Sequence, residues 1–251
     1  MSFPQNDNED CEIIIEENFG DYDEKFRIVI LGYIAVGKSC LLNKVSKDQF
    51  IEDYKCTAGF EYSQFIVKVK NKKIRLNIFD ITGNESLRNF IKATLNNTNL
   101  AILVYSIENK KSFEYIDKVY QELKSQLSSC PNIILVGNKT DLEEKREVTT
   151  EEGQKKCDDE DDFKLFLECS AKNGTNVKEV FIEAAKMCYK NGEEGKIVLN
   201  LEDKKDTDDD KEEKEEERIN SNNVDDNEKN ENKASQEEVK SKKDKKCCDC
   251  F

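Results

Sequence analysis

The sequence predicts an α/β fold in which a six-stranded, mostly parallel sheet carries helices on both faces. Strand-length apolar runs alternate with helix-length amphipathic segments from about residue 25 to residue 190. Alternation of this kind is typical of an open sheet with right-handed crossovers. Several of the runs are apolar throughout, which indicates strands that are covered on both faces.

The expected strands are, in chain order, 26–32, 60–69, 74–80, 100–106, 132–137 and 163–170. In the second strand, apolar and polar residues nearly alternate, and the KNKK segment at 70–73 makes a turn into the third. We therefore expect these two strands to form a hairpin, with 60–69 as the one antiparallel edge strand. Helices are expected at 38–46, 86–97, 112–128, 150–160 and 177–190, and Ser112 and Asn176 are start signals for two of them.

The net charge of −14 belongs to the two ends of the chain. Residues 1–24 contain nine acidic and no basic residues, and residues 201–246 have a net charge of −6. We expect 1–24 to be a disordered acidic extension and 191–246 a disordered charged tail, which has too few large apolar residues to offset the entropy of ordering. A helix over 208–218 is the alternative for part of the tail. The folded domain is expected at 25–190.

Composition excludes several classes of protein and chemistry. No apolar run approaches the roughly 20 residues of a membrane helix, and residues 1–24 have neither a basic start nor an apolar signal region, so we expect a cytosolic protein. There is no histidine, which excludes general-base chemistry by that side chain. Six scattered cysteines are expected to be reduced core residues, namely Cys40, Cys56, Cys130, Cys157, Cys169 and Cys188.

A phosphate-binding loop, GYIAVGKS, lies at 32–39 between the first strand and the first helix. It matches GxxxxGK[ST], whose backbone N–H groups surround the β-phosphate of a nucleotide with help from the helix dipole. Lys38 is expected to reach the β and γ oxygens, and the Ser39 hydroxyl to take one position on Mg²⁺. The predicted contacts of the loop are Gly32, Ala35, Val36, Gly37, Lys38, Ser39 and Cys40.

Two further motifs, GNKTDL and CSAKNG, follow the fifth and sixth expected strands and predict a guanine site. The carboxylate of Asp141 matches the N1–H and 2-amino donors that guanine has and adenine lacks. Asn138 can bind N7 and hold neighbouring loops, and the Ala171 N–H suits guanine O6. Both motifs lie at the carboxyl edge, where open α/β sheets bind ligands. The predicted base contacts are Asn138, Lys139, Asp141, Ser170, Ala171 and Lys172, and they disfavour an ATP-using enzyme.

These motifs resemble the Ras superfamily of small GTPases, and most closely its Rab branch. The similarity covers about residues 25–190 and implies a G domain that binds GTP or GDP with Mg²⁺ and acts as a switch in vesicle and membrane trafficking. By position, it implies that Phe50 lies edge-on to guanine, that Thr57 and Asp80 (through water) hold Mg²⁺, and that the Gly83 N–H senses the γ-phosphate.

The resemblance also implies partners. These are an exchange factor, a GTPase-activating protein, an escort or GDI-type chaperone, and effectors that bind the switch regions. Phe60, Tyr62 and Phe79 are in plausible effector positions, although core or hairpin packing explains Phe60 and Tyr62 equally well. It further implies a monomer that binds no nucleic acid polymer.

The departures from the Rab pattern concern hydrolysis, whose implied residues are Asn84, Lys38 and Gly83. Asn84 stands where the family has the glutamine that orients the attacking water, and its side chain reaches roughly 1.5 Å less far. Ile34 and Ala35 replace small residues of the phosphate loop, and the Ile34 position obstructs an incoming arginine finger. We expect GTP binding with slow hydrolysis. The alternative is neutral drift, in which another residue or a partner's glutamine positions the water.

The chain ends in KSKKDKKCCDCF. Residues 247–251 resemble a Rab prenylation motif, with Cys247, Cys248 and Cys250 as lipidation candidates; zinc or disulfide chemistry is the alternative. Two prenyl chains beside five lysines predict anchoring on the cytosolic face of intracellular membranes, in exchange with the cytosol. A scaffold that is always GTP-bound is the rival function.

Overall fold

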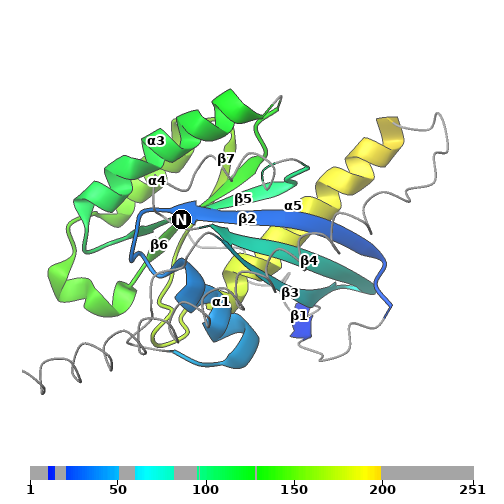
Figure 1. Ribbon diagram of the computed structural model, residues 1–251, viewed down its shortest axis with the longest axis horizontal. Coiled ribbons are helices and arrows are strands. Elements are labelled where there is room, and N and C mark those ends of the chain that lie inside the picture. The colour runs from blue at the N-terminus through cyan, green and yellow to red at the C-terminus, as the bar shows by residue number, and fades with distance from the viewer. Residues whose placement is uncertain are drawn as a thin grey trace, which may run out of the picture. The chain divides into compact units, whose positions relative to one another are not determined.

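The computed structural model describes residues 11–14, 21–50, 60–81, 95, 97–127 and 129–198, with side chains left out at residue 60 and beyond residue 190. All of these belong to one unit of the chain, residues 1–200. The elements are, in order, β1 Cys11–Ile14, β2 Glu24–Gly32, α1 Lys38–Lys47, β3 Phe60–Val69, β4 Lys72–Ile81, β5 Leu100–Ser106, α3 Lys110–Gln126, β6 Asn132–Asn138, the 3-10 helix η2 Thr140–Lys145, α4 Thr150–Asp158, β7 Phe163–Glu168 and α5 Val177–Val198 (Figure 1).

The strands form one sheet in the order β1-β3-β4-β2-β5-β6-β7. From β4 to β7 all neighbouring pairs are parallel, and β3 is antiparallel to β4 as expected for the hairpin. The α/β class and the mostly parallel sheet are therefore confirmed, while the expected count of six strands is wrong. A seventh strand, β1, pairs antiparallel with β3 and takes its place at the edge.

This seventh strand also corrects the expectation that residues 1–24 are disordered throughout. The segment CEII contains apolar residues that alternate across the strand, and Cys11 and Ile13 pack against the hydrophobic core. The many acidic residues of 1–24 led to the expectation of disorder, and the short apolar run within them was overlooked. The described part of the acidic extension therefore contributes to the fold, and β2 begins at Glu24.

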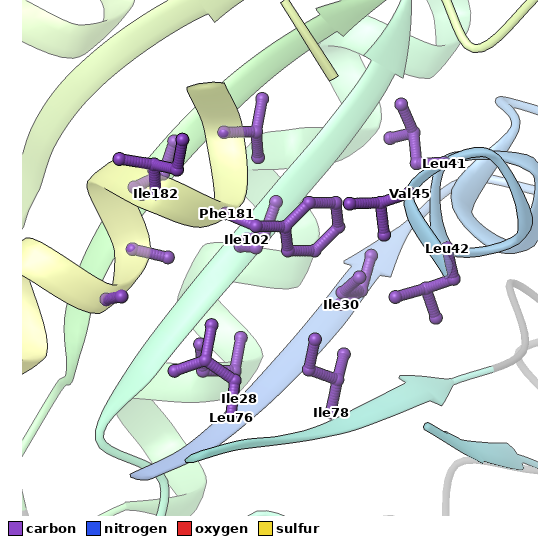
Figure 2. Packing of buried hydrophobic residues seen from close by; sticks show 14 of the residues in the cluster. Ile28, Ile30, Leu41, Leu42, Val45, Leu76, Ile78, Ile102, Phe181 and Ile182 are labelled. Carbon is purple, nitrogen blue, oxygen red and sulfur yellow. The ribbon is translucent and has the colours of Figure 1, made fainter. Parts of the chain in front are cut away.

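Two hydrophobic clusters cover the two faces of the sheet. α1 and α5 pack on one face, and α3 and α4 on the other. In Figure 2, Phe181 extends from α5 toward Val45 of α1, with Ile30 of β2 nearby in the view. All three side chains are buried, as are the central strands β2, β5 and β6 over most of their length. This core holds the carboxyl ends of the parallel strands at a common edge.

The helix boundaries follow capping more than apolar periodicity. α3 begins two residues earlier than expected, because the Asn109 side chain caps it by accepting a hydrogen bond from the Ser112 N–H at 3.1 Å. Thr149 and Glu152 form a reciprocal capping box that starts α4. α5 continues to Val198, eight residues beyond the expected end. Among the described residues, no helix is both long and apolar enough to cross a membrane.

Candidate functional site

The phosphate loop connects β2 to α1 at the carboxyl edge of the sheet. Gly32 has φ 148°, and a Cβ there would lie 2.1 Å from the main-chain oxygen of Val104 on β5. Gly37 has φ 95°, and a Cβ there would lie 2.3 Å from the Asn138 side-chain nitrogen. Side chains at both positions would therefore push the loop away from its neighbours. Cys40, the last of the predicted loop contacts, is half-buried in the first turn of α1.

Lys38 lies inside this loop, with only 7% of its surface exposed. Its Nζ donates hydrogen bonds to the main-chain oxygens of Gly32 at 3.1 Å and of Tyr33 at 2.9 Å. These bonds fold the lysine back over the loop, and its role toward phosphate oxygens stays a prediction. The ammonium charge is thus held where the N–H groups at the start of α1 already favour an anion.

Ser39 and Asp80 form the candidate metal site. The Ser39 hydroxyl donates a hydrogen bond to Asp80 Oδ2, and Asp80 is fully buried at the end of β4. Its Oδ1 has no hydrogen-bond partner among the described residues. Burial raises the pKa of Asp80 to about 6, although Lys38 and the Ser39 hydrogen bond act in the opposite direction.

A buried carboxylate with an unsatisfied oxygen is costly, and a divalent cation removes that cost. Its combination with a serine hydroxyl fits Mg²⁺, which needs few protein oxygens because it retains several waters. The structure therefore brings together two of the three predicted metal ligands. The third, Thr57, lies outside the described residues.

Asn138 connects the phosphate loop to the base-binding loops. It is 1% exposed; its Nδ2 donates to the Val36 oxygen at 2.8 Å, and its Oδ1 accepts from the Ala171 N–H at 3.1 Å. The structure thus contains the loop-holding role that was expected of Asn138. In this arrangement the Ala171 N–H, predicted to meet guanine O6, is directed at Asn138.

Asp141 and Ser170 carry the predicted selectivity for guanine. Asp141 Oδ1 accepts from the Ser170 hydroxyl at 2.6 Å, and Ser170 is fully buried. This bond orients the carboxylate and uses one of its two oxygens. Asp141 itself is exposed, which suits a group that meets a ligand. Lys139 Nζ forms an ion pair with Glu108 at 2.7 Å.

A family model of the Ras family matches residues 27–190, which is more than half of the chain. The chain belongs to the Ras family. It is therefore a small GTPase with a Ras-like G domain, and members of this family bind GTP and GDP, typically with Mg²⁺, hydrolyse GTP, and act as switches with regulators and effectors.

The structure also contains an arginine clamp, centred on Arg146, that was not predicted from the sequence. Arg146 makes two hydrogen bonds to the Glu168 carboxylate, at 2.6 and 3.0 Å, and two to Glu143, at 2.8 and 2.7 Å. These carboxylates raise the pKa of Arg146, and the hydrogen bonding that Glu143 accepts from the guanidinium is the largest cause. Glu168 immediately precedes the CSAK segment, and Arg146 follows the helix η2 that carries Asp141. The clamp therefore ties together the two segments that contain the predicted base contacts.

The clamp was missed because only the fold brings its members together. The sequence offers one signal for them, which is nearness to predicted base contacts: Arg146 lies five residues after Asp141, and Glu168 lies two residues before Ser170. Arg146, after η2, and Glu168, at the end of β7, are 22 residues apart, and no helical or strand spacing identifies them as a pair.

The structure describes the two phosphate-loop residues that differ from the Rab pattern. Ile34 is 44% exposed, and Ala35 has φ 60°, a left-handed conformation that alanine rarely adopts. Tyr33 makes an edge contact with Tyr115 of α3, with ring centroids 5.0 Å apart. Phe50, 37% exposed, is the last described residue before the gap at 51–59.

The remaining predicted residues lie outside or at the margin of what the structure describes. Gly83 and Asn84 fall in the gap at 82–94, and Cys247, Cys248 and Cys250 lie beyond residue 198. Their predicted roles stay predictions. Lys172 is described and exposed.

Proposed function

We propose that this small GTPase is a Rab-like switch of membrane trafficking whose GTP hydrolysis is slow. The observation that supports slow hydrolysis is the exposed Ile34 side chain on the phosphate loop. An arginine finger must approach the γ-phosphate to stabilise the transition state, and such fingers contribute large rate factors in this class of enzyme. A branched side chain at this point occupies the space of that approach.

Asn84 adds a second obstacle at the same catalytic step. Its amide is carried on a stem one methylene shorter than that of the family's glutamine. Misplacement of a catalytic group by about 1 Å can cost on the order of a hundredfold in rate. Binding does not depend on either residue, because Lys38, Ser39 and Asp80 hold the phosphates and the metal. Mg²⁺, when bound, supplies charge neutralisation at the β- and γ-phosphate oxygens.

Single-turnover GTP hydrolysis tests the slow-hydrolysis proposal. We expect the double variant Asn84→Gln, Ile34→Gly to hydrolyse GTP faster than the natural chain, and the two single variants to lie between them. Adding an arginine-finger activating protein should widen the difference for Ile34→Gly in particular. Equal rates in all four proteins would support neutral drift instead.

The rival function is a scaffold that stays GTP-bound and is regulated by abundance or lipidation. Nucleotide extracted from the protein isolated from cells separates the two functions. A mixture of GDP and GTP supports the switch, whereas GTP alone supports the scaffold.

The Rab assignment and the membrane location rest on the sequence. The segments GKSCLL, EVTTEEGQ and ECSAKNGTNV resemble Rab sequences residue by residue. The last five residues contain three cysteines beside a basic cluster. We propose lipid anchoring through Cys247, Cys248 and Cys250 on the cytosolic face of intracellular membranes, with an exchange factor, an activating protein and a GDI-type chaperone as regulators. Loss of membrane signal when all three cysteines become serine is the expected result, and unchanged localisation would refute it.

A further inference from the structure

The edge of the sheet is covered by a segment from outside the Ras-family match. β1 pairs with the last four residues of β3, from Cys11 opposite Val69 to Ile14 opposite Ile66. This is the hairpin end of β3, whereas its other end, Phe60, follows the gap that contains Thr57. β1 therefore lies at the opposite end of the strand from the switch region.

The pairing shows what kind of segment this edge accepts. Cys11 and Ile13 are half-buried against the core cluster on the α1–α5 face, opposite the buried Val69 and Val67. Glu12, between them, is exposed and lies opposite Lys68, which is also exposed. Opposite charges in directly facing strand positions are favourable. The edge thus selects an extended segment with an acidic residue between two apolar residues.

Charge complementarity extends beyond that one pair. The segment from residue 68 to residue 75 of the hairpin contains five basic residues and no acidic one, whereas residues 1–24 contain nine acidic residues and no basic one. A net positive hairpin favours an acidic strand over a neutral or basic one at the same edge.

The chain is attached to the hairpin a second time, independently of β1. The Asp23 carboxylate accepts from the Lys73 N–H at 2.8 Å and from Lys72 Nζ at 2.9 Å, and the Asp23 N–H donates to the Lys73 oxygen at 2.8 Å. The Tyr22 ring lies against the Arg75 guanidinium, at 4.6 Å. These contacts hold the start of β2 in place, so β1 can leave the edge without disturbing β2.

β1 is also a weak occupant of this edge. It has only four residues, and its core-facing side chains are half-buried, so the gain from burial is small against the entropy of ordering the segment. A longer strand with the same pattern would gain more main-chain hydrogen bonds along β3.

We propose that the Ile66–Val69 edge of β3 is a docking surface for an extended acidic–apolar strand of another protein, and that β1 is the internal segment which this strand replaces. The surface is separate from the nucleotide site and goes beyond the proposed switch function. Docking is by strand addition, with Lys68 selecting the acidic position.

A fluorescent peptide with the sequence of residues 9–16, EDCEIIIE, serves as the probe in reducing buffer, and polarisation measures its binding to the full chain. The natural chain competes through its own tethered arm, which acts at a high effective concentration. We expect the variant Ile13→Asp, whose arm can no longer pack, to bind the peptide at least tenfold more tightly. Equal binding to both proteins would overturn the proposal.

Charge reversal supplies the matched control. The chain variant Lys68→Glu should prefer a peptide carrying Glu12→Lys over the natural peptide, and a peptide carrying Ile13→Asp should bind to none of the proteins. Lys68 is exposed, so this variant retains the fold even if Ile13→Asp does not. An unchanged preference would refute docking at this edge. Sedimentation of the natural chain as a dimer that Ile13→Asp dissociates would also overturn it, since the occupant would then be a second copy.

Discussion

Replacing Glu168 with glutamine tests whether the arginine clamp positions the guanine-binding loops. The substitution keeps the shape of the side chain but removes its charge and one of the two Glu168 oxygens that accept from Arg146. Both side chains are largely buried, with 16% of Arg146 and 17% of Glu168 exposed. Hydrogen bonds to charged groups contribute about 1.5–3 kcal/mol, so we expect a loss of about 2 kcal/mol in the free energy of unfolding.

The same loss should appear in nucleotide binding. Without the clamp, the loops after β6 and β7 separate more easily when the nucleotide is absent, and binding must restore them. A tenfold change in affinity corresponds to about 1.4 kcal/mol. If nucleotide binding must supply the whole of about 2 kcal/mol to restore the loops, affinity for GDP decreases about thirtyfold. Release of a fluorescent GDP analogue after chasing with unlabelled GDP measures this change.

The second partner of Arg146 provides the control. Glu143 binds the same guanidinium but is 65% exposed, so Glu143→Gln should leave both unfolding and GDP release close to those of the natural chain. Equal effects of the two substitutions would refute the reasoning from burial. A destabilised Glu168→Gln variant with unchanged GDP release would refute the positioning role, because the pair would then contribute to stability alone.

Three further predictions concern single residues of the site. The pKa of Asp80 in the folded state is about 6, above its ordinary value of 3.8. In EDTA, the contribution of this group to the free energy of unfolding should therefore be lost as pH rises from about 4 to above 6, by up to about 3 kcal/mol. Urea titrations measure this loss, and Asp80→Asn should remove the pH dependence. Conversely, Mg²⁺ affinity should fall as pH drops below about 6. Ala35→Gly should raise the free energy of unfolding by about 1 kcal/mol because it relieves a left-handed alanine, whereas Asn97→Gly, at the same φ of 60°, should change it little. Gly32→Ala should abolish nucleotide retention, measured by the GDP content of the purified protein, because its Cβ would overlap main-chain atoms of β5.

The parallel strands could be predicted because their signal is local. The runs 28–31 of β2, 100–105 of β5 and 133–136 of β6 are apolar throughout, and the structure buries all of their residues. The phosphate loop was equally accessible, since its glycines, Lys38 and Ser39 lie within eight consecutive residues.

Features that depend on distant partners were beyond this kind of inference. β1 has only four residues, and nothing in CEII indicates that β3 lies beside it. Ser112 was expected to start a helix, yet its hydroxyl is buried and bonded to the oxygen of Asn109, which is the actual cap. The pairing of β1 with β3 is a tertiary contact, which a local sequence pattern cannot report. The Asn109 cap is a local contact, three residues from Ser112, and it was missed because serine is itself a favoured cap residue.

The bonding of Asn138 has a consequence for attempts to redesign the site. One amide group joins the loop that holds phosphates to the segment that holds the base, so substitution there removes both functions together. Asp141, by contrast, is exposed, and within the described part of the chain its carboxylate accepts a hydrogen bond from the Ser170 hydroxyl. A change of base preference is therefore expected from substitutions at Asp141, which leave the phosphate loop in place, whereas substitutions at Asn138 disturb both segments.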